Sequence, residues 1–307
     1  MSGKIWLGLG GVVVCAAAVW GVMAYRSRAL PPDVLLKRLP AKDSLVVAVD
    51  FAGLRKLGLL QMLAGPKIDQ EPDYAKFVSD THFNYAQDLD YVLAAFGGRG
   101  KFILAEGRFD WSALRSYALK QGGECSGSVC KMAGSTPERR ISFLPVQSNV
   151  MALAVSTDDN AALVMQAAVA NTASNIPTPD AAVWLYLPPA ILKSPGQLPE
   201  GTVLFARSVD EAKSVTIGFG SEGDHVSAKL NVLCNSDQDA LMTTAELTKV
   251  TEVLRSVIAH AGQHPNPSDW SGVLTSGKFE NKGSRVFGYW PIQRAFFENL
   301  VGAQGLR

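Results

Sequence analysis

The chain has 307 residues, 47% of them apolar, and its 29 basic and 28 acidic residues leave a formal net charge of +1. Nucleic-acid-binding proteins normally carry a clear excess of Lys and Arg, so the composition excludes nucleic acid as the expected partner. The length allows one large domain or two of ordinary size, and the apolar content is ample for a sizeable core.

Residues 5–25 form an uninterrupted uncharged run between Lys4 and Arg26. A helix of that length is roughly 30 Å long and can cross a bilayer. Trp6 and Tyr25 lie at its two ends, where aromatic rings favour the headgroup region. The sequence therefore predicts a transmembrane anchor over 1–29. A cleaved secretory signal peptide is the alternative, because 22–24 offers a small-residue cleavage site.

The positive charges on either side of the anchor bear on its orientation in the membrane. Arg26, Arg28, Lys37 and Arg38 come after the run, against Lys4 before it, and a count of positive charges alone would place the body inside the cell. The short basic head is nevertheless typical of a signal-anchor, which exports the rest of the chain. We therefore expect a single-pass protein of the inner membrane with a periplasmic or otherwise extracytoplasmic body.

The first part of the body, 30–171, reads as mixed strands and helices. Gly97-Gly98-Arg99-Gly100 predicts a hairpin turn, and Asp110 predicts a helix start. By apolar periodicity we expect strands at 44–51, 89–96, 101–106, 129–132, 140–144 and 149–155, and helices at 34–39, 54–63, 73–80, 111–120 and 160–170.

After a polar linker at 172–180 the order starts again in 181–307. We expect strands at 182–187, 214–220, 225–234, 273–279 and 285–290, and helices at 188–193, 240–261 and 291–300, the last beginning at Pro291. The order β-α-ββ-α-ββ-α thus occurs twice. The predicted fold class is α+β, with two tandem similar repeats whose antiparallel sheets are covered by helices.

Cys125 and Cys130 are the informative cysteines. Four residues separate them, and two are small or turn-forming, so the short loop can close as a disulfide. Two unpaired thiols are the alternative. A metal site is a weaker interpretation, because no second cysteine pair or nearby histidine accompanies them. Cys234, at the end of an alternating run, reads as a strand residue.

No sequence motif points to catalysis or to a cofactor. His260 and His264 have a spacing at which two imidazoles can hold a metal ion, but they lack the H-E-x-x-H arrangement and Pro265 ends the helix. We assign no catalytic, cofactor-binding or metal-binding residues. The loop 134–140 carries Arg139 and Arg140 beside the cysteine loop, which makes these guanidinium groups candidates for an anion or partner contact, with a solvated connection as the alternative.

Four segments together, 40–51, 109–114, 130–139 and 290–294, resemble a family of single-pass, membrane-anchored bacterial proteins of unknown function, best represented among acidobacteria. The resemblance covers most of the chain. It implies a setting in the bacterial envelope and supplies no activity or catalytic residues.

These observations favour an extracytoplasmic binding or scaffolding protein anchored by residues 5–25. A groove between the two halves is the expected binding site, because ligand sites favour domain interfaces. The expected partner is an envelope protein or a small hydrophobic ligand. An envelope enzyme of the hydrolase type, with a site dispersed along the sequence, is the alternative function.

Overall fold

The structure is a computed structural model that describes residues 29–60, 72–134, 136, 138–167, 176–193, 203–222 and 225–304. Within these ranges it is a mixed α+β protein built on one large antiparallel sheet, which confirms the predicted class. The predicted anchor at 5–25 lies outside the described residues. Within the described ranges, no helix is both long and apolar enough to cross a bilayer.

The first half of the chain supplies seven strands to the sheet and most of the short helices. Its strands are β1 (Leu45–Asp50), β2 (Leu89–Gly97), β3 (Gly100–Gly107), β4 (Glu124–Ser126), β5 (Val129–Ala133), β6 (Arg140–Gln147) and β7 (Val150–Ser156). Its helices are α2 (Pro32–Leu36), α3 (Phe51–Lys56), α5 (Pro72–Thr81), α6 (Tyr85–Asp88), α7 (Trp111–Lys120) and the 3-10 helix η1 (Ala161–Met165).

The second half supplies five strands and the longest described helix. Its strands are β8 (Val183–Leu187), β9 (Ser214–Glu222), β10 (His225–Leu233), β11 (Lys278–Lys282) and β12 (Arg285–Ile292). Its helices are α8 (Pro189–Leu192), α9 (Val203–Arg207), α10 (Asp237–His260), α11 (Trp270–Thr275) and α12 (Arg294–Gln304).

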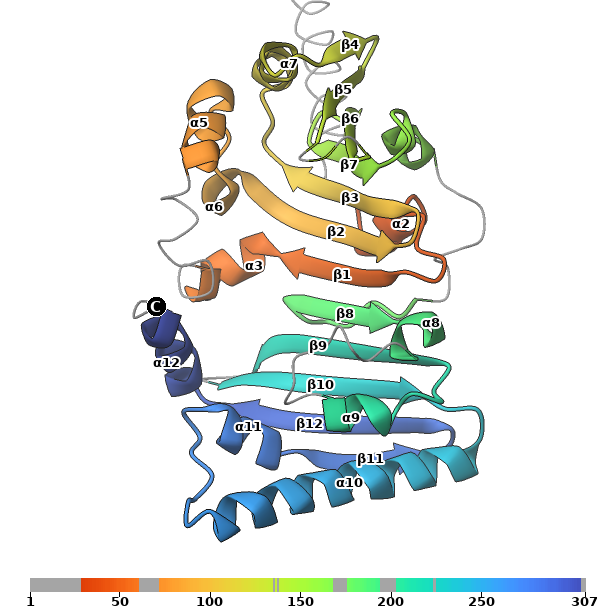
Figure 1. The fold of residues 1–307 in the computed structure, drawn as a ribbon, viewed down its shortest axis with the longest axis vertical. Helices are drawn as coiled ribbons and strands as arrows, with labels where there is room; N and C mark the ends of the chain where they lie inside the picture. Colours follow the sequence, from red (N-terminus) through yellow and green to blue (C-terminus); the bar gives the residue numbers. More distant parts are fainter. Residues whose placement is uncertain are drawn as a thin grey trace, which may run out of the picture.

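All twelve strands belong to one sheet, in the order β11-β12-β10-β9-β8-β1-β2-β3-β7-β6-β5-β4. The first strand of each half therefore lies at the centre, where β1 and β8 pair in antiparallel fashion (Figure 1). The two halves meet along this strand pair, so the seam between them is a continuous hydrogen-bonded ladder.

Local signals explain where several elements begin. Asp110 caps α7 by accepting a hydrogen bond from the Ala113 N–H at 2.9 Å, and Ser236 caps α10 through the Asp239 N–H. The β2–β3 turn needs Gly100, whose φ is +133° and whose missing Cβ would lie 2.5 Å from the Val155 carbonyl oxygen. The predicted hairpin and both helices are confirmed.

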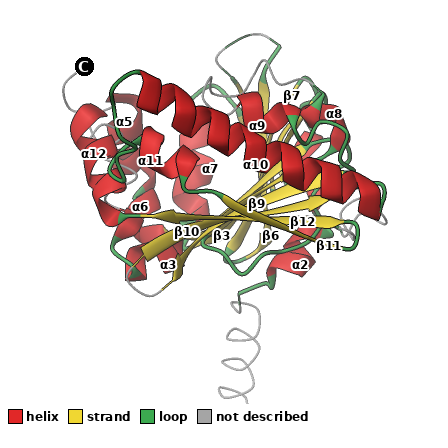
Figure 2. Cartoon of the chain, turned by 90° about the horizontal axis from the view of Figure 1, so that it is seen from below, coloured by secondary structure: helices red, strands yellow, loops and turns green. Residues whose placement is uncertain are grey.

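Helices cover the two faces of the sheet unequally. Figure 2 shows α5, α7, α9 and α10 on one side, here called the helix face, and α2 on the other, here called the α2 face. Leu35, Leu36 and Leu39, from α2 and the turn after it, pack with Val46 and Ala48 of β1 in the largest buried cluster. The helix η1 joins the same cluster, so α2 and η1 together cover the first half of the α2 face.

Four sequence predictions were wrong in detail. The helix expected at 54–63 is not continuous, because α3 ends at Lys56 and a turn follows in which Gly58 has a φ of +67°; residues 61–63 lie outside the described residues. Residues 273–279 are not one strand, because Asp269 caps the helix α11 and the strand β11 begins only at Lys278. Residues 161–165 form a 3-10 helix instead of an α-helix. Pro291 does not begin the last helix but lies in β12, and α12 begins at Arg294. The pairing of β12 with β11 ends at Tyr289, so Pro291 has a neighbouring strand only on the β10 side, where a proline is tolerated.

Candidate ligand-binding groove

The second half of the α2 face carries a groove. Trp184 of β8 belongs to the cluster under α2, and it lies opposite Gly218 of β9, which lies opposite Lys229 of β10. Directly opposed residues share a face of the sheet. Gly218 and Lys229 therefore lie on the α2 face, together with Asn231 and its partner Phe287 of β12.

The groove has a volume of about 490 Å³, and one wall is the segment that leads into β8. Pro177, Pro179 and Ala181 line that wall. Gly218 permits the close approach of this segment, since a Cβ there would lie 3.1 Å from the Cβ of Ala181. The volume falls within the range of small-molecule sites.

Several polar side chains line the floor of the groove. Thr216 and Ser227 are buried residues that line it, and Asn231 and Lys229 stand beside them. Phe287 adds one half-buried aromatic ring. Arg285 donates to the Asn231 Oδ1 at 3.2 Å, which fixes the orientation of that amide. The site thus presents an amide and an ammonium group beside an aromatic ring, together with two hydroxyl side chains that are themselves buried.

A charged pair closes one end of the floor. Lys229 Nζ lies 3.2 Å from the Glu222 carboxylate. The hydrogen bond from Lys229, and then that from Tyr289, lower the pKa of Glu222 below its ordinary value. The Glu222 charge is therefore maintained at neutral pH and balances that of Lys229.

The cysteine pair of the sequence prediction lies far along the sheet from the groove. Cys125 of β4 and Cys130 of β5 are opposite each other and joined by a disulfide, with a Cα–Cα distance of 4.1 Å. Arg115 of α7 donates to the carbonyl oxygens of Gly127 at 2.9 Å and Cys125 at 3.3 Å. These contacts fasten the β4–β5 hairpin to the helix face.

Arg139 and Arg140 also lie in the first half, at the start of β6. The Arg140 Nε is 3.4 Å from the Asp159 carboxylate, and both side chains are about half exposed. The backbone N–H of Arg139 donates to the Thr136 carbonyl oxygen at 3.0 Å. An anion or partner contact at these two guanidinium groups stays a prediction.

The histidine pair is not joined by further metal ligands in the described part of the chain. His260 Nδ1 lies 2.7 Å from the Ser256 carbonyl oxygen, within α10. Across the described ranges, no group of three or more His, Cys, Asp or Glu side chains is placed to hold a metal ion.

A buried carboxylate ties down the segment that precedes α2. Glu106 of β3 is 5% exposed, and the Asn149 side-chain amide donates to its Oε1 at 3.1 Å. Burial raises the pKa of Glu106, while a hydrogen bond from the Leu30 backbone acts in the opposite direction. Neighbouring Tyr91 has its pKa raised to about 12, chiefly by burial. This cluster holds the chain where it enters the body.

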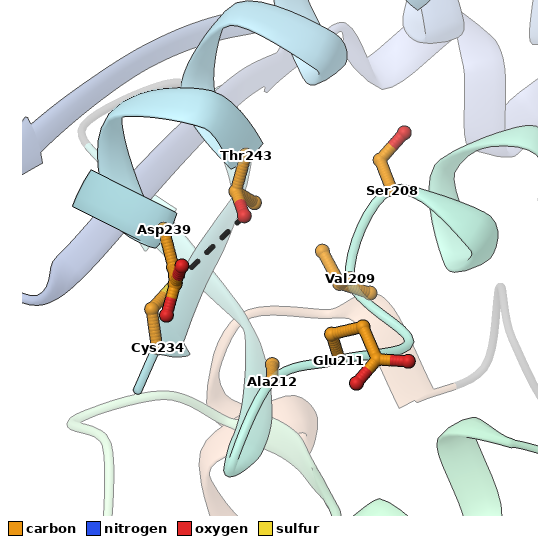
Figure 3. Close-up of a pocket in the computed structure, with 7 residues that line it drawn as sticks. All are labelled: Ser208, Val209, Glu211, Ala212, Cys234, Asp239 and Thr243. Atoms are coloured by element: carbon orange, nitrogen blue, oxygen red, sulfur yellow. Dashed lines mark hydrogen bonds between the residues drawn. The ribbon is translucent and has the colours of Figure 1, made fainter. Parts of the chain in front are cut away.

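A second, much smaller cavity of about 30 Å³ adjoins the buried thiol of Cys234 (Figure 3). Cys234 Sγ is 3.9 Å from the Thr243 Oγ1, and burial raises the pKa of the thiol. The cavity has room for about one water molecule. The thiol is therefore neutral and enclosed.

The sequence analysis did not find the groove residues. Their only signal is the alternation along β9, β10 and β12, which puts Thr216, Ser227, Asn231 and Phe287 on one face. Such alternation is the ordinary pattern of a sheet with one solvated side. It identifies an open face without identifying a site.

Comparison with known proteins gives little further guidance. No known protein family and no curated protein matches the sequence. Solved structures of TP0453, a Treponema protein, are similar in shape. Its crystal form III is 9% identical, with a TM-score of 0.49 over 89% of this chain and 99% of that one. Crystal form I is 10% identical, with a TM-score of 0.48 over 89% and 99%. Likeness at this level establishes nothing about function.

Proposed function

We propose that the protein is an extracytoplasmic binding protein, held at the inner membrane by residues 5–25, and that the groove on the α2 face is its binding site. The observation that carries the proposal is the groove itself, about 490 Å³ in volume, on a face that is closed over the first half of the sheet. No catalytic arrangement is assigned to it.

The proposal includes an internal duplication of the body. Read outwards from the seam, β1-β2-β3-β7-β6 in one direction corresponds to β8-β9-β10-β12-β11 in the other. In each half a helix follows the third of these strands in the chain and precedes the last two. In the first half this is α7, between β3 and the pair β6 and β7, and in the second half it is α10, between β10 and the pair β11 and β12. The hairpin β4–β5 is then an addition to the first repeat. The same order of elements in both halves supports their origin from one duplicated segment.

The duplication allows the groove to be compared with the equivalent position in the first repeat. The segment before β1 is α2, whose leucines are fully buried on the sheet. The described segment before β8 starts at Ile176, contains Pro177 and Pro179, and lines the groove. Among the described residues, the face that α2 covers in the first repeat carries this groove in the second repeat.

An experiment in cells tests this proposal without knowledge of the ligand. Single cysteines are introduced as Phe287→Cys in the groove and Lys249→Cys on the exposed side of α10, and the parent chain supplies the background. A membrane-impermeant maleimide is applied to intact spheroplasts and to the purified full chain. We expect Lys249→Cys to react equally in both and Phe287→Cys to react more slowly in spheroplasts, where a ligand occupies the groove.

The two positions separate the parts of the proposal. Failure of Lys249→Cys to react until the spheroplasts are lysed would place the body in the cytoplasm and contradict the orientation. Equal reaction of Phe287→Cys in spheroplasts and in purified protein, with Lys249→Cys accessible in both, would contradict occupancy of the groove.

A further inference from the structure

We infer that the groove binds a neutral carbohydrate, with the ring of Phe287 against one face of a sugar and the polar floor bonded to its hydroxyl groups. The inference rests on the proposed binding function and names the class of ligand. It is drawn from the charge, the backbone and the polarity of the lining, taken in turn.

The described part of the lining is close to electrically neutral. Its charged side chains are Lys229 and Asp180, and Lys229 is already paired with Glu222 at 3.2 Å. An anionic ligand such as a phosphate needs unopposed cations or bidentate guanidinium groups. The guanidinium of Arg285, which reaches the groove floor, donates to Asn231. The charges of the described lining therefore favour an uncharged ligand.

The backbone under the groove is already hydrogen-bonded. β9 pairs with both β8 and β10, and β10 pairs with both β9 and β12, along the length of the groove. Extended peptides are usually bound as an added strand at a free sheet edge, through main-chain hydrogen bonds. The floor of this groove consists of paired strands and has no free sheet edge. It therefore lacks the means by which sheets usually bind peptides.

The floor also presents polar side chains that an apolar ligand would separate from water. Asn231 is partly exposed and Lys229 is exposed, whereas Thr216 and Ser227 beside them are already buried. A hydrocarbon chain laid on Asn231 and Lys229 would remove water from their polar groups without offering hydrogen bonds, which is costly. A sugar offers its own hydroxyl groups to these two side chains.

The remaining apolar element fits the same class. Phe287 presents one half-buried ring next to Asn231, and the C–H groups on one side of a pyranose ring can pack on an aromatic face. One ring beside an amide and an ammonium group is complementary to a molecule with one apolar face and many hydroxyls. The volume of about 490 Å³ accommodates a short oligosaccharide segment.

The test is direct binding by the full chain in phosphatidylcholine nanodiscs, because maltoside or glucoside detergents would themselves present sugars. The probes are chitotriose, cellotriose and maltotriose, with inorganic phosphate and trialanine as comparison ligands. Binding is monitored by ligand-observed NMR and by titration. We expect at least one trisaccharide to bind and the comparison ligands not to bind.

Variants tie any binding to the groove. Phe287→Ala should weaken trisaccharide binding at least about tenfold, and Phe287→Trp should retain it. Trp270→Ala removes an aromatic ring that is 54% exposed on α11 and should leave binding unchanged. Thermal melting of each variant shows that the fold is kept. Absence of binding by all three sugars, or binding that Phe287→Ala leaves intact, would overturn the inference. Slow labelling of Phe287→Cys in spheroplasts would in that case still support a groove ligand of another class.

Discussion

Ala48 of β1 and Trp184 of β8 lie opposite each other across the seam between the two halves. The indole of Trp184 is 2% exposed and packs in the same cluster as Leu35 and Leu39 of the first half. A side chain from the second half thus completes the core of the first. The halves are therefore joined by shared packing as well as by strand pairing.

Truncation of this indole should destabilise the whole body. We expect Trp184→Ala to lower the free energy of unfolding by about 3–5 kcal/mol, the usual cost of removing a buried aromatic side chain. Denaturant unfolding, monitored by intrinsic fluorescence and circular dichroism, measures it. The matched change Trp270→Ala, at an exposed position, should cost about 1 kcal/mol or less. Equal losses for the two variants would contradict the shared core.

The segment between the predicted anchor and β1 is part of the fold. Leu35 and Leu39 are fully buried, and the Leu30 backbone bonds to Glu106. A chain that begins at Ala29 should fold, whereas one that begins at Ala41 should not. Within the full chain, Leu39→Ala should cost about 2–5 kcal/mol, and Leu57→Ala, at a leucine that is 44% exposed, should cost less than about 0.5 kcal/mol. Circular dichroism melting distinguishes these outcomes.

Glu106 predicts a pH dependence of stability. Burial raises its pKa in the folded protein above the ordinary value of 4.5. The folded state therefore holds a proton that the unfolded chain has lost, and stability falls as pH rises from 4.5 through the raised pKa. Glu106→Gln carries no charge at any pH and removes this contribution.

The measurement is the stability difference between Glu106→Gln and the native chain. We expect the variant to be the more stable at pH 7, with the difference shrinking to nothing below pH 4.5. A difference that is constant across this range would show that Glu106 does not titrate differently in the folded and unfolded states. Asn149→Ala, which removes the amide that donates to Glu106, should destabilise the body most where the carboxyl is ionised.

The disulfide should contribute modestly to stability. The bonded cysteines are only 5 residues apart in sequence, so closing the loop is worth about 2 kcal/mol by the chain-entropy argument. Cys125→Ser/Cys130→Ser should lower the free energy of unfolding by that amount, and a reducing agent should have the same effect on the native chain and none on the variant. Cys234→Ala, at the enclosed free thiol, serves as the control for reducing-agent sensitivity. Stability that is independent of reductant would contradict a structural disulfide.

Local features of the fold could be predicted from the sequence, and long-range ones could not. The cap at Asp110 and the turn at Gly100 depend on residues within a few positions, so α7 and the β2–β3 hairpin were predicted closely. Residues 270–275 form the helix α11, although the β-branched Val273 favours a strand. Asp269 caps this helix and α10 packs against it, and together these interactions outweigh the strand preference of Val273. The pairing of Val47 with Leu185 joins segments far apart in the chain and has no local signal.

The candidate groove could not be predicted from the sequence either, because it also depends on long-range strand pairing. Thr216, Asn231 and Phe287 come from three strands, and only the register of β9, β10 and β12 brings them onto one face. Among the described residues, this part of the face is uncovered because α2 packs over the first half. The sequence analysis placed the expected groove between the halves, and the structure has the strand pair β1–β8 at that position.

Protease accessibility of the body in intact spheroplasts tests most directly the claim that the protein is a binding protein tethered outside the cytoplasm. A cytoplasmic protein in the same sample serves as the control for lysis. We predict that residues 30–307 are digested while the control stays intact, which would leave the groove exposed to ligands of the envelope. Protection of the body until the spheroplasts are lysed would contradict this account and transfer the search for a ligand to the cytoplasm.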